Sequence, residues 1–399
     1  MAEMKAGYKQ TDIGVIPEDW DVKPIGQTLK IHHGKSQKEI EVSMGKYPIL
    51  ATGGKIGSTN SYLHSKPSVL IGRKGTIDKP QYIETPFWTV DTLFWSELLG
   101  SNSAKFMYYI FCLINWQQYN EASGVPSLNA RTIEQVQIPV PKPEEQKQIA
   151  AALSDVDGLI ESLEKLIAKK RNMKTAVMQQ LLTGKKRLPG FDGEWEEKRI
   201  DEFGFFKSGN GFPTKYQGHQ QGDYPFFKVS DMNNFGNATH MTASNNYISH
   251  KIAKTLSVNI IPEKSIIFAK IGAAIFLERK KITVQQSCID NNMMAFIPDH
   301  HISDYTFFHY LFLHLTFGRL VAATALPSLS PKDIGGLALY IPKKNEQTAI
   351  AAILSDMDTE IGALEQRLDK ARSLKTGMMQ ELLTGRTRFI KTNKKQEAA

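Results

Sequence analysis

The chain of 399 residues is poor in cysteine, with only Cys112 and Cys288. Two cysteines exclude a disulfide-stapled scaffold and a cysteine-rich zinc site, and they fit a reducing compartment. No uninterrupted apolar run approaches the length of about 18 residues that a membrane-spanning helix needs, so we expect no membrane segment. The first residues lack the hydrophobic core of a secretory signal, and we therefore expect a cytoplasmic protein.

Motifs of common nucleotide, metal and methyl-transfer sites are also missing. The glycine-rich segment 53–57 (GGKIG) lacks the spacing of a phosphate-binding P-loop, and no HExxH zinc motif occurs. The Asn-Pro-Pro-aromatic motif of adenine methylation is absent as well. The histidine pairs at 32–33 and 300–301 have no cysteine or acidic residue at a ligand spacing, and we interpret them as loop histidines. We predict no catalytic residue, no metal ligand and no cofactor in this chain.

The charge balance is positive but moderate. The chain has 49 Lys and Arg residues against 41 Asp and Glu residues, a formal net charge of +8. Such a balance favours a polyanionic partner such as nucleic acid. A basic protein without a special partner remains an alternative on charge alone. The length is typical of two or three domains, and 41% hydrophobic residues are enough to build their cores.

The longest regular pattern lies between residues 143 and 183. Apolar or long-stemmed residues recur there in alternating steps of four and three, which is the a/d pattern of a coiled coil. Pro143 suits a first helical turn, and Gly184 suits a C-terminal stop. Such a helix would be about 60 Å long. The predicted seam contains Ile149, Leu153, Val156, Ile160, Leu163, Ile167, Val177 and Leu181.

The same stretch occurs again 201 positions later. Residues 144–157 (EEQKQIAAALSDVD) return at 345–358 as NEQTAIAAILSDMD, and 174–187 return at 375–388. A repeat at this distance indicates a duplicated domain. Trp20 has a counterpart at Trp195, so the ends of the copies match while their interiors differ in length. The second seam contains Ile350, Leu354, Met357, Ile361, Leu364, Leu368, Met378 and Leu382.

The interiors of the copies, roughly 26–100 and 200–300, favour β structure, because short β-branched and aromatic runs alternate with glycine-rich turns. We expect a helix over 102–119 and again over 303–321, each followed by a loop, extended segments and a long helix. Residues 1–13 are expected to be a loose lead-in. The predicted fold class is α+β, with two pseudo-symmetric β-rich globular domains joined by two long helices.

The two helices are expected to pair with each other. If two like modules are related by a pseudo-two-fold axis, helices lying across that axis run antiparallel. We therefore predict an intramolecular antiparallel coiled coil. An intermolecular coiled coil fits the heptads equally well.

Several loops combine glycine with lysine or arginine. Glycine lets the backbone approach a ligand closely, and the flanking basic side chains can contact phosphates or base edges. Lys270 and Gly272 lie in FAKIGAA much as Arg73 and Gly75 lie in IGRKGTI. Taken alone, each such loop is more often a solvated turn. The predicted DNA-binding residues are Lys55, Gly57, Arg73, Lys74, Lys228, Lys270, Arg279 and Lys280.

As a set, the motifs resemble those of the specificity subunit (HsdS) of type I restriction–modification enzymes. They comprise the Gly-x-Ile-Pro-x-x-Trp opening at 14–20, the GVPSLN and ALPSLS loops, the helix start at 144–157 and the QQLLTGKKRLPGF junction. The set covers both ends of each repeat, over half of the chain. The resemblance implies target-recognition domains at 1–142 and 188–343, helical regions at 143–187 and 344–388, and a tail at 389–399, which we expect to be disordered.

The resemblance also implies function and partners. Each recognition domain would recognise one half of a bipartite site on double-stranded DNA. The paired helices would set the gap between the halves and dock two modification (methyltransferase) subunits, HsdM. Restriction (translocase-nuclease) subunits, HsdR, would complete the complex. S-adenosylmethionine, ATP and Mg²⁺ would act on those partner subunits.

Two other interpretations fit the residues alone. One is a stand-alone nuclease with an unrecognised site, and the other is a structural coiled-coil protein with a basic surface. Assays of methyl transfer and DNA cleavage on the isolated chain separate the specificity subunit from the nuclease.

Overall fold

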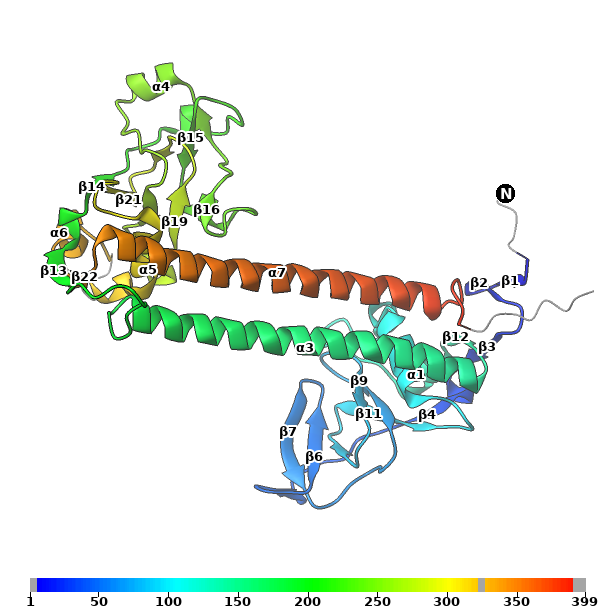
Figure 1. The fold of residues 1–399 in the computed structure, drawn as a ribbon. Coiled ribbons are helices and arrows are strands. Elements are labelled where there is room, and N and C mark those ends of the chain that lie inside the picture. Colours follow the sequence, from blue (N-terminus) through cyan, green and yellow to red (C-terminus); the bar gives the residue numbers. More distant parts are fainter. Residues whose placement is uncertain (1–5, 322–326, 390–399) are drawn as a thin grey trace, which may run out of the picture. The chain divides into compact units, whose positions relative to one another are not determined.

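The computed structural model describes residues 6–321 and 327–389. The chain forms two compact units, one of residues 1–165 with 365–399 and the other of residues 166–364. Each unit contains one β-rich globular part and about half of each of two long helices (Figure 1). The predicted α+β class with two long helices is confirmed. No helix among the described residues is both long and apolar enough to span a membrane.

The two long helices are α3 (Pro143–Leu181) and α7 (Lys344–Leu382), each of 39 residues. Both end in a glycine with a left-handed backbone, Gly184 with φ +68° and Gly385 with φ +72°. This conformation favours glycine because a side chain would be strained there. The duplicated Leu-Leu-Thr-Gly motif is therefore the C-terminal stop of each helix.

Within each unit the helices run antiparallel. In the first, Asp157 of α3 contacts Lys375 of α7, and Glu164 further along α3 contacts Arg372, which is earlier in α7. In the second unit the direction is the same, because Lys170 of α3 contacts Glu360 of α7 and Lys174, further along α3, contacts Asp358, which is earlier in α7. All 16 predicted seam residues are buried or half-buried. Burial of each large apolar side chain contributes roughly 1.5–3 kcal/mol.

The first globular part is built on two four-stranded sheets, ordered β10-β6-β7-β5 and β4-β11-β8-β9. Strand β8 is buried along its whole length and pairs antiparallel with β11. The strands are β1 (Tyr8–Thr11), β2 (Gly14–Pro17), β3 (Asp21–Pro24), β4 (Leu29–His32), β5 (Glu41–Val42), β6 (Tyr47–Ala51), β7 (Gly54–Thr59), β8 (Ser68–Gly72), β9 (Gln81–Ile83), β10 (Trp88–Thr89), β11 (Leu93–Leu98) and β12 (Gln137–Val140). Helices α1 (Ala104–Leu113) and α2 (Ala130–Gln135) complete it.

The second globular part has a five-stranded sheet, β14-β21-β18-β19-β16, and a three-stranded sheet, β17-β15-β20. Strands β18 and β21 are buried at every position. The strands are β13 (Glu196–Arg199), β14 (Gly204–Ser208), β15 (Tyr224–Phe227), β16 (His240–Met241), β17 (Tyr247–Ile248), β18 (Ile266–Ala269), β19 (Lys280–Thr283), β20 (Cys288–Ile289), β21 (Met293–Pro298) and β22 (Ala338–Ile341). The helices are α4 (His250–Thr255), α5 (Tyr305–His314) and α6 (Pro331–Gly335).

Three local predictions need correction. The helix expected over 102–119 ends at Leu113, because Ile114 is extended and the chain turns so that Trp116 is buried in the core. Its counterpart, α5, likewise ends at His314, inside the predicted 303–321. Where only extended segments were expected after the GVPSLN loop, the six-residue helix α2 forms, and the Asn129 side chain caps its first turn.

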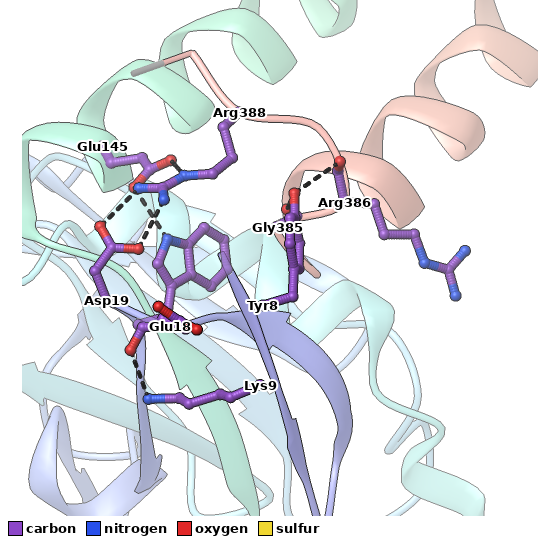
Figure 2. Close-up of polar contacts among 9 residues, drawn as sticks. Tyr8, Lys9, Glu18, Asp19, Glu145, Gly385, Arg386 and Arg388 are labelled. Atoms are coloured by element: carbon purple, nitrogen blue, oxygen red, sulfur yellow. Dashed lines mark hydrogen bonds and ion pairs between the residues drawn. The ribbon is translucent and has the colours of Figure 1, made fainter. Parts of the chain in front are cut away.

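The expected loose lead-in at 1–13 is also wrong for its described part, since β1 pairs with β2 as an antiparallel hairpin. The Tyr8 hydroxyl donates to the carbonyl of Gly385, just past the end of α7, at 2.9 Å (Figure 2). Half of the hairpin's strand residues, those of β1, thus come from a segment with no apolar alternation that could have revealed it. Residues 1–5, and the predicted tail apart from Phe389, lie outside the described residues.

A buried ion pair fixes the end of α7 in the first unit. The guanidinium of Arg388 binds both Glu145 oxygens, at 2.8 and 2.7 Å, and reaches the Asp19 carboxylate at 2.7 Å (Figure 2). The indole of Trp20 donates to Glu145 at 3.0 Å. The hydrogen bond from Arg388 holds the pKa of Asp19 below its ordinary value.

The second unit repeats this anchor with residues of the other copy. Arg187, just past the end of α3, binds both oxygens of Glu346 at 2.7 and 2.8 Å. The indole of Trp195 donates to Glu346 at 3.1 Å. The duplicated tryptophan, glutamate and arginine therefore have the same task in both units, which is to tie a helix end to the globular part beside it.

Candidate nucleic-acid interface

The loop after β8 carries the basic residues predicted to contact DNA in the first unit, and it is held by the GVPSLN loop. Gly75 donates its backbone N–H to the carbonyl of Pro126 at 2.8 Å, and Leu128 donates to Arg73 at 3.0 Å. Arg73 in turn donates to the carbonyl of Thr92 at 2.8 Å. We call residues 73–75 with 126–128 the first loop junction.

The second unit contains the same arrangement. Gly272 donates its N–H to the carbonyl of Pro327 at 2.8 Å, and Leu329 donates to Lys270 at 2.8 Å. The Lys270 N–H reaches the carbonyl of Asn292, again at 2.8 Å. We call residues 270–272 with 327–329 the second loop junction. The first two residues of ALPSLS lie outside the described residues.

The two junctions confirm that Arg73 and Gly75 correspond to Lys270 and Gly272. Both glycines have a positive φ, +88° and +77°, which explains why the position is glycine in each copy. The leucine of each Pro-Ser-Leu motif is buried in the core of its unit, so the motif pins the basic loop from one side. Both motifs are visible in the sequence, but nothing in the sequence indicates that they meet.

The first junction presents its cations to solvent. Lys74 is exposed, and Arg73 is half-buried with its guanidinium 3.4 Å from the carbonyl of Asp91. Lys55, on β7, is exposed as well. Exposed cations on a loop with a fixed backbone are suited to phosphate or base contact. Whether these residues bind DNA remains a prediction.

Gly57 lies in β7 without a positive φ. A Cβ there would come within 2.5 Å of the Glu41 side chain on the neighbouring strand β5. Because that contact is with the far end of an exposed, flexible side chain, it does not by itself require glycine at this position, and a role of Gly57 in DNA binding stays a prediction.

In the second unit two predicted cations already have partners. The Lys270 ammonium donates to the Ser208 hydroxyl at 3.0 Å, and the Lys228 ammonium donates to Gln217 at 3.2 Å. Both side chains are half-buried, and so is Arg279. An ammonium held by a neutral oxygen can exchange that oxygen for a phosphate, so these residues stay candidates.

Lys280 must be removed from the predicted surface. Its side chain is 1% exposed, forms an ion pair with Glu278 and lies 4.4 Å from the ring centroid of Phe317. Burial lowers the pKa of Lys280. Glu278 also accepts the backbone N–H groups of Phe317 and Gly318. Lys280 cannot reach DNA without breaking its ion pair with the half-buried Glu278.

The histidine pairs differ from the expectation in one respect. His32 ends strand β4 and stacks on Trp95 with ring centroids 4.3 Å apart, whereas His300 and His301 lie in a turn. Within the described ranges, no group of three or more His, Cys, Asp or Glu side chains is placed to hold a metal ion.

Buried polar residues at the helix starts were missed as functional positions. Glu145 and Gln146 of α3, and their counterparts Glu346 and Gln347 of α7, are buried in their units. The side-chain amide oxygen of Gln146 accepts the backbone N–H of Ser103, the cap of α1, at 2.9 Å. The sequence does contain a signal for these positions. Glu145 and Gln146 recur unchanged 201 positions later, and a helix surface exposed to solvent does not require such identity.

Comparisons with known proteins agree with this duplicated arrangement. The family model of the type I restriction modification DNA specificity domain matches twice, at residues 17–169 and 192–371. The chain is 23% identical to the type I restriction enzyme MjaIX specificity subunit of Methanocaldococcus jannaschii, covering 96% of both chains. It is 20% identical to the EcoDI specificity subunit of Escherichia coli, over 93% of this chain and 88% of that one.

Two solved structures have a similar fold. The S subunit of a type I restriction–modification system from M. genitalium superposes with a TM-score of 0.62 at 17% identity, covering 95% of this chain and 99% of that chain. A chain from a structure of complex assembly and conformational transition of the type I R-M system has a TM-score of 0.57 at 14% identity, covering 93% and 99%.

Proposed function

This chain belongs to the family of type I restriction-modification DNA specificity subunits, and we propose that each of its globular parts recognises one half of a bipartite site on double-stranded DNA. The observation that carries the proposal is that the family model matches twice, once in each half of the chain. Two like modules in one chain are suited to a DNA site with two separated half-sites, as in dimeric DNA-binding proteins.

The loop junctions support DNA contact at a definite place in each module. Arg73 and Lys270 occupy equivalent positions, and each is fixed by two backbone hydrogen bonds. A fixed backbone lowers the entropy lost when the side chain binds, while the side chain itself can differ between modules. We propose that Lys74 and Lys55 contact phosphates, and that Arg73 contacts a base edge.

The helix pair is proposed to set the gap between the half-sites and to dock two modification subunits. A two-helix stem with a buried apolar seam is stiff, and stiffness is what a fixed gap requires. Restriction subunits would join the same complex. We place the recognition domains at 1–142 and 188–343, with the helical regions at 143–187 and 344–388 between and after them. Catalysis, together with S-adenosylmethionine, ATP and Mg²⁺, is assigned to the partner subunits.

Methylation mapping tests the proposal. The chain is combined with the modification subunits of its own system and S-adenosylmethionine, and methylated adenines are located in a random duplex library. We expect methylation at one bipartite sequence, and none from either component alone. Methylation without sequence preference, or turnover of S-adenosylmethionine by the highly purified chain, would overturn the proposal.

A further inference from the structure

A tyrosine, an aspartate and a lysine meet where the first globular part joins the helix pair. The Tyr109 hydroxyl of α1 donates to one oxygen of Asp157 on α3 at 2.8 Å. The other Asp157 oxygen lies 2.6 Å from the ammonium of Lys375 on α7. One carboxylate therefore joins the globular part to both helices of the stem.

The second unit has the same three residue types in the same geometry. Tyr310 of α5 donates to one oxygen of Asp358 on α7 at 2.7 Å, and Lys174 of α3 lies 2.5 Å from the other oxygen. Each residue stands 201 positions from its counterpart. The lysine ammonium also lies over the tyrosine ring, at 5.6 Å from Tyr109 and 5.1 Å from Tyr310.

The geometry gives these contacts a positioning role. In the first unit, α1 lies beside the N-terminal half of α3 (Figure 1) and is attached to it by polar contacts at two places, Gln146 and Asp157. These residues are 11 positions apart, or about 16 Å along the helix. A single attachment leaves a pivot, whereas two separated attachments fix the angle at which the globular part stands on the stem.

We propose that two sets of contacts, Tyr109–Asp157–Lys375 and Tyr310–Asp358–Lys174, hold each globular part at a fixed angle on the helix pair. They thereby determine how strongly the protein prefers one gap between the half-sites over gaps one base pair shorter or longer. The inference rests on the proposed function. In this inference these residues act through the orientation of the globular part on the helices, to which their contacts belong. If a globular part can tilt on the helix pair, the distance between the two recognition surfaces takes a wider range of values. The surfaces themselves, and the bases they recognise, stay the same.

Tyr109→Phe is the sharpest variant, because it removes only the hydroxyl and leaves the ring packing and the Asp157–Lys375 pair intact. Tyr310→Phe is its counterpart in the second unit. Arg372→Ala is the matched control, since Arg372 forms an exposed helix-to-helix pair with Glu164 at 2.7 Å and a second pair with Asp369 on its own helix. All are assembled with the modification subunits, and thermal melting checks that they fold.

The readout is the methylation rate on duplexes with both half-sites at the optimal gap and at gaps one base pair shorter or longer. In Tyr109→Phe or Tyr310→Phe we expect the rate at a wrong gap, relative to the optimal gap, to rise about tenfold, the effect of losing one hydrogen bond to a charged acceptor. The preferred half-sequences stay unchanged, and Arg372→Ala behaves like the wild type.

Broadening by either tyrosine variant supports the inference. It is wrong if both keep the wild-type gap preference, or if either changes a half-sequence. Should Tyr109→Phe fail to assemble, Lys375→Met, which keeps the hydroxyl and removes the tie to the second helix, is judged by the same criterion. Loss of sequence-specific methylation already in the wild type would contradict the proposed function instead, so the two failures are distinguishable.

Discussion

Lys375 on α7 approaches Asp157 on α3 to 2.6 Å, and Lys174 on α3 approaches Asp358 on α7 to 2.5 Å. In each pair, the lysine comes from the second half of one long helix and the aspartate from the first half of the other. The exchange is reciprocal, because each repeat supplies one lysine and one aspartate. This reciprocity explains why both residue types recur at the same offset in the sequence.

Replacement of Arg388 tests the anchor at the end of α7. Arg388→Met leaves the buried carboxylate of Glu145, which is 1% exposed, without its cation. We expect the free energy of unfolding to fall by about 3 kcal/mol, because an uncompensated buried charge is costly. Urea denaturation of the wild type and the variant measures this difference in the free energy of unfolding, read from the transition of the first unit.

Arg386→Met serves as the control for this prediction. Arg386 is two residues earlier, its side chain is 65% exposed and its nearest carboxylate oxygen, on Glu381, is 3.9 Å away. The control should change stability by less than about 0.5 kcal/mol. Equal effects of the two substitutions would show that the Arg388 anchor contributes nothing beyond a surface charge.

Alkaline pH is expected to destabilise the protein through the two positioning tyrosines. Burial raises the pKa of Tyr109 and of Tyr310, and the hydrogen bonds to Asp157 and Asp358 raise it further. The unfolded chain releases these protons near a pH of about 10, whereas the folded chain retains them. Their stabilisation is therefore full below that pH and is lost as the pH rises from there through the higher folded-state pKa.

The double variant with Tyr109→Phe and Tyr310→Phe measures this contribution. Its stability should decrease less steeply with pH above about 10 than that of the wild type. Denaturation midpoints between neutral and alkaline pH are the measurement. Parallel pH profiles for the two proteins would refute the assignment.

The first loop junction is tested by two substitutions with different expected signatures. Arg73→Ala should cost about 1–3 kcal/mol of binding free energy and relax one half-site only. Lys74→Ala should weaken binding to all sequences and lower the salt slope by about one. Lys198→Ala is the control, because Lys198 is paired with Glu196 on β13, whose partner strand β22 contains no junction residue. Unchanged affinity and salt dependence in both junction variants would show that this loop does not contact DNA.

The helix pair is tested as the determinant of the gap by lengthening it. A four-residue insertion within 158–173 adds about 6 Å to a helix, against 3.4 Å per base pair. We expect the preferred gap to grow by roughly one to two base pairs with both half-sequences retained. Some affinity is lost because the insertion is a stutter in the heptads. Methylation mapping gives the gap, and an unchanged gap or a changed half-sequence would speak against the helices as the spacer.

The helical part of the fold could be predicted because its signal is periodic. The heptad pattern predicted the two ends of α3 to within a few residues. It also identified a seam whose positions are all buried or half-buried. The break after Leu113 had no comparable signal, since neither glycine nor proline occurs there. It depends on Trp116 entering the core, which is a tertiary effect.

The candidate site was harder to predict because burial of a charge depends on its surroundings. Lys280 and Lys74 look alike in the sequence, each beside another basic residue, yet one is buried against Glu278 and the other is exposed. Similarly, Asp157 looks like an ordinary helix-surface acid until α1 and α7 are placed beside it. Repetition of the residue in the second copy was the one usable signal.

Exchange of one interior tests the claim that the two globular parts act as separate recognition modules. A hybrid carrying a related subunit's segment in place of 26–100 keeps the Pro126–Leu128 loop. That loop holds its partner through backbone N–H and C=O groups, so a foreign loop with glycine at the Gly75 position can pair with it. The segment 201–300 is left intact.

Methylation mapping of this hybrid, assembled with the modification subunits, is the most direct measurement. The account predicts one new half-sequence beside the unchanged half-sequence recognised through 201–300, at a gap set by the unaltered helices. Simultaneous change or loss of both half-sequences in a hybrid that folds and assembles would contradict it.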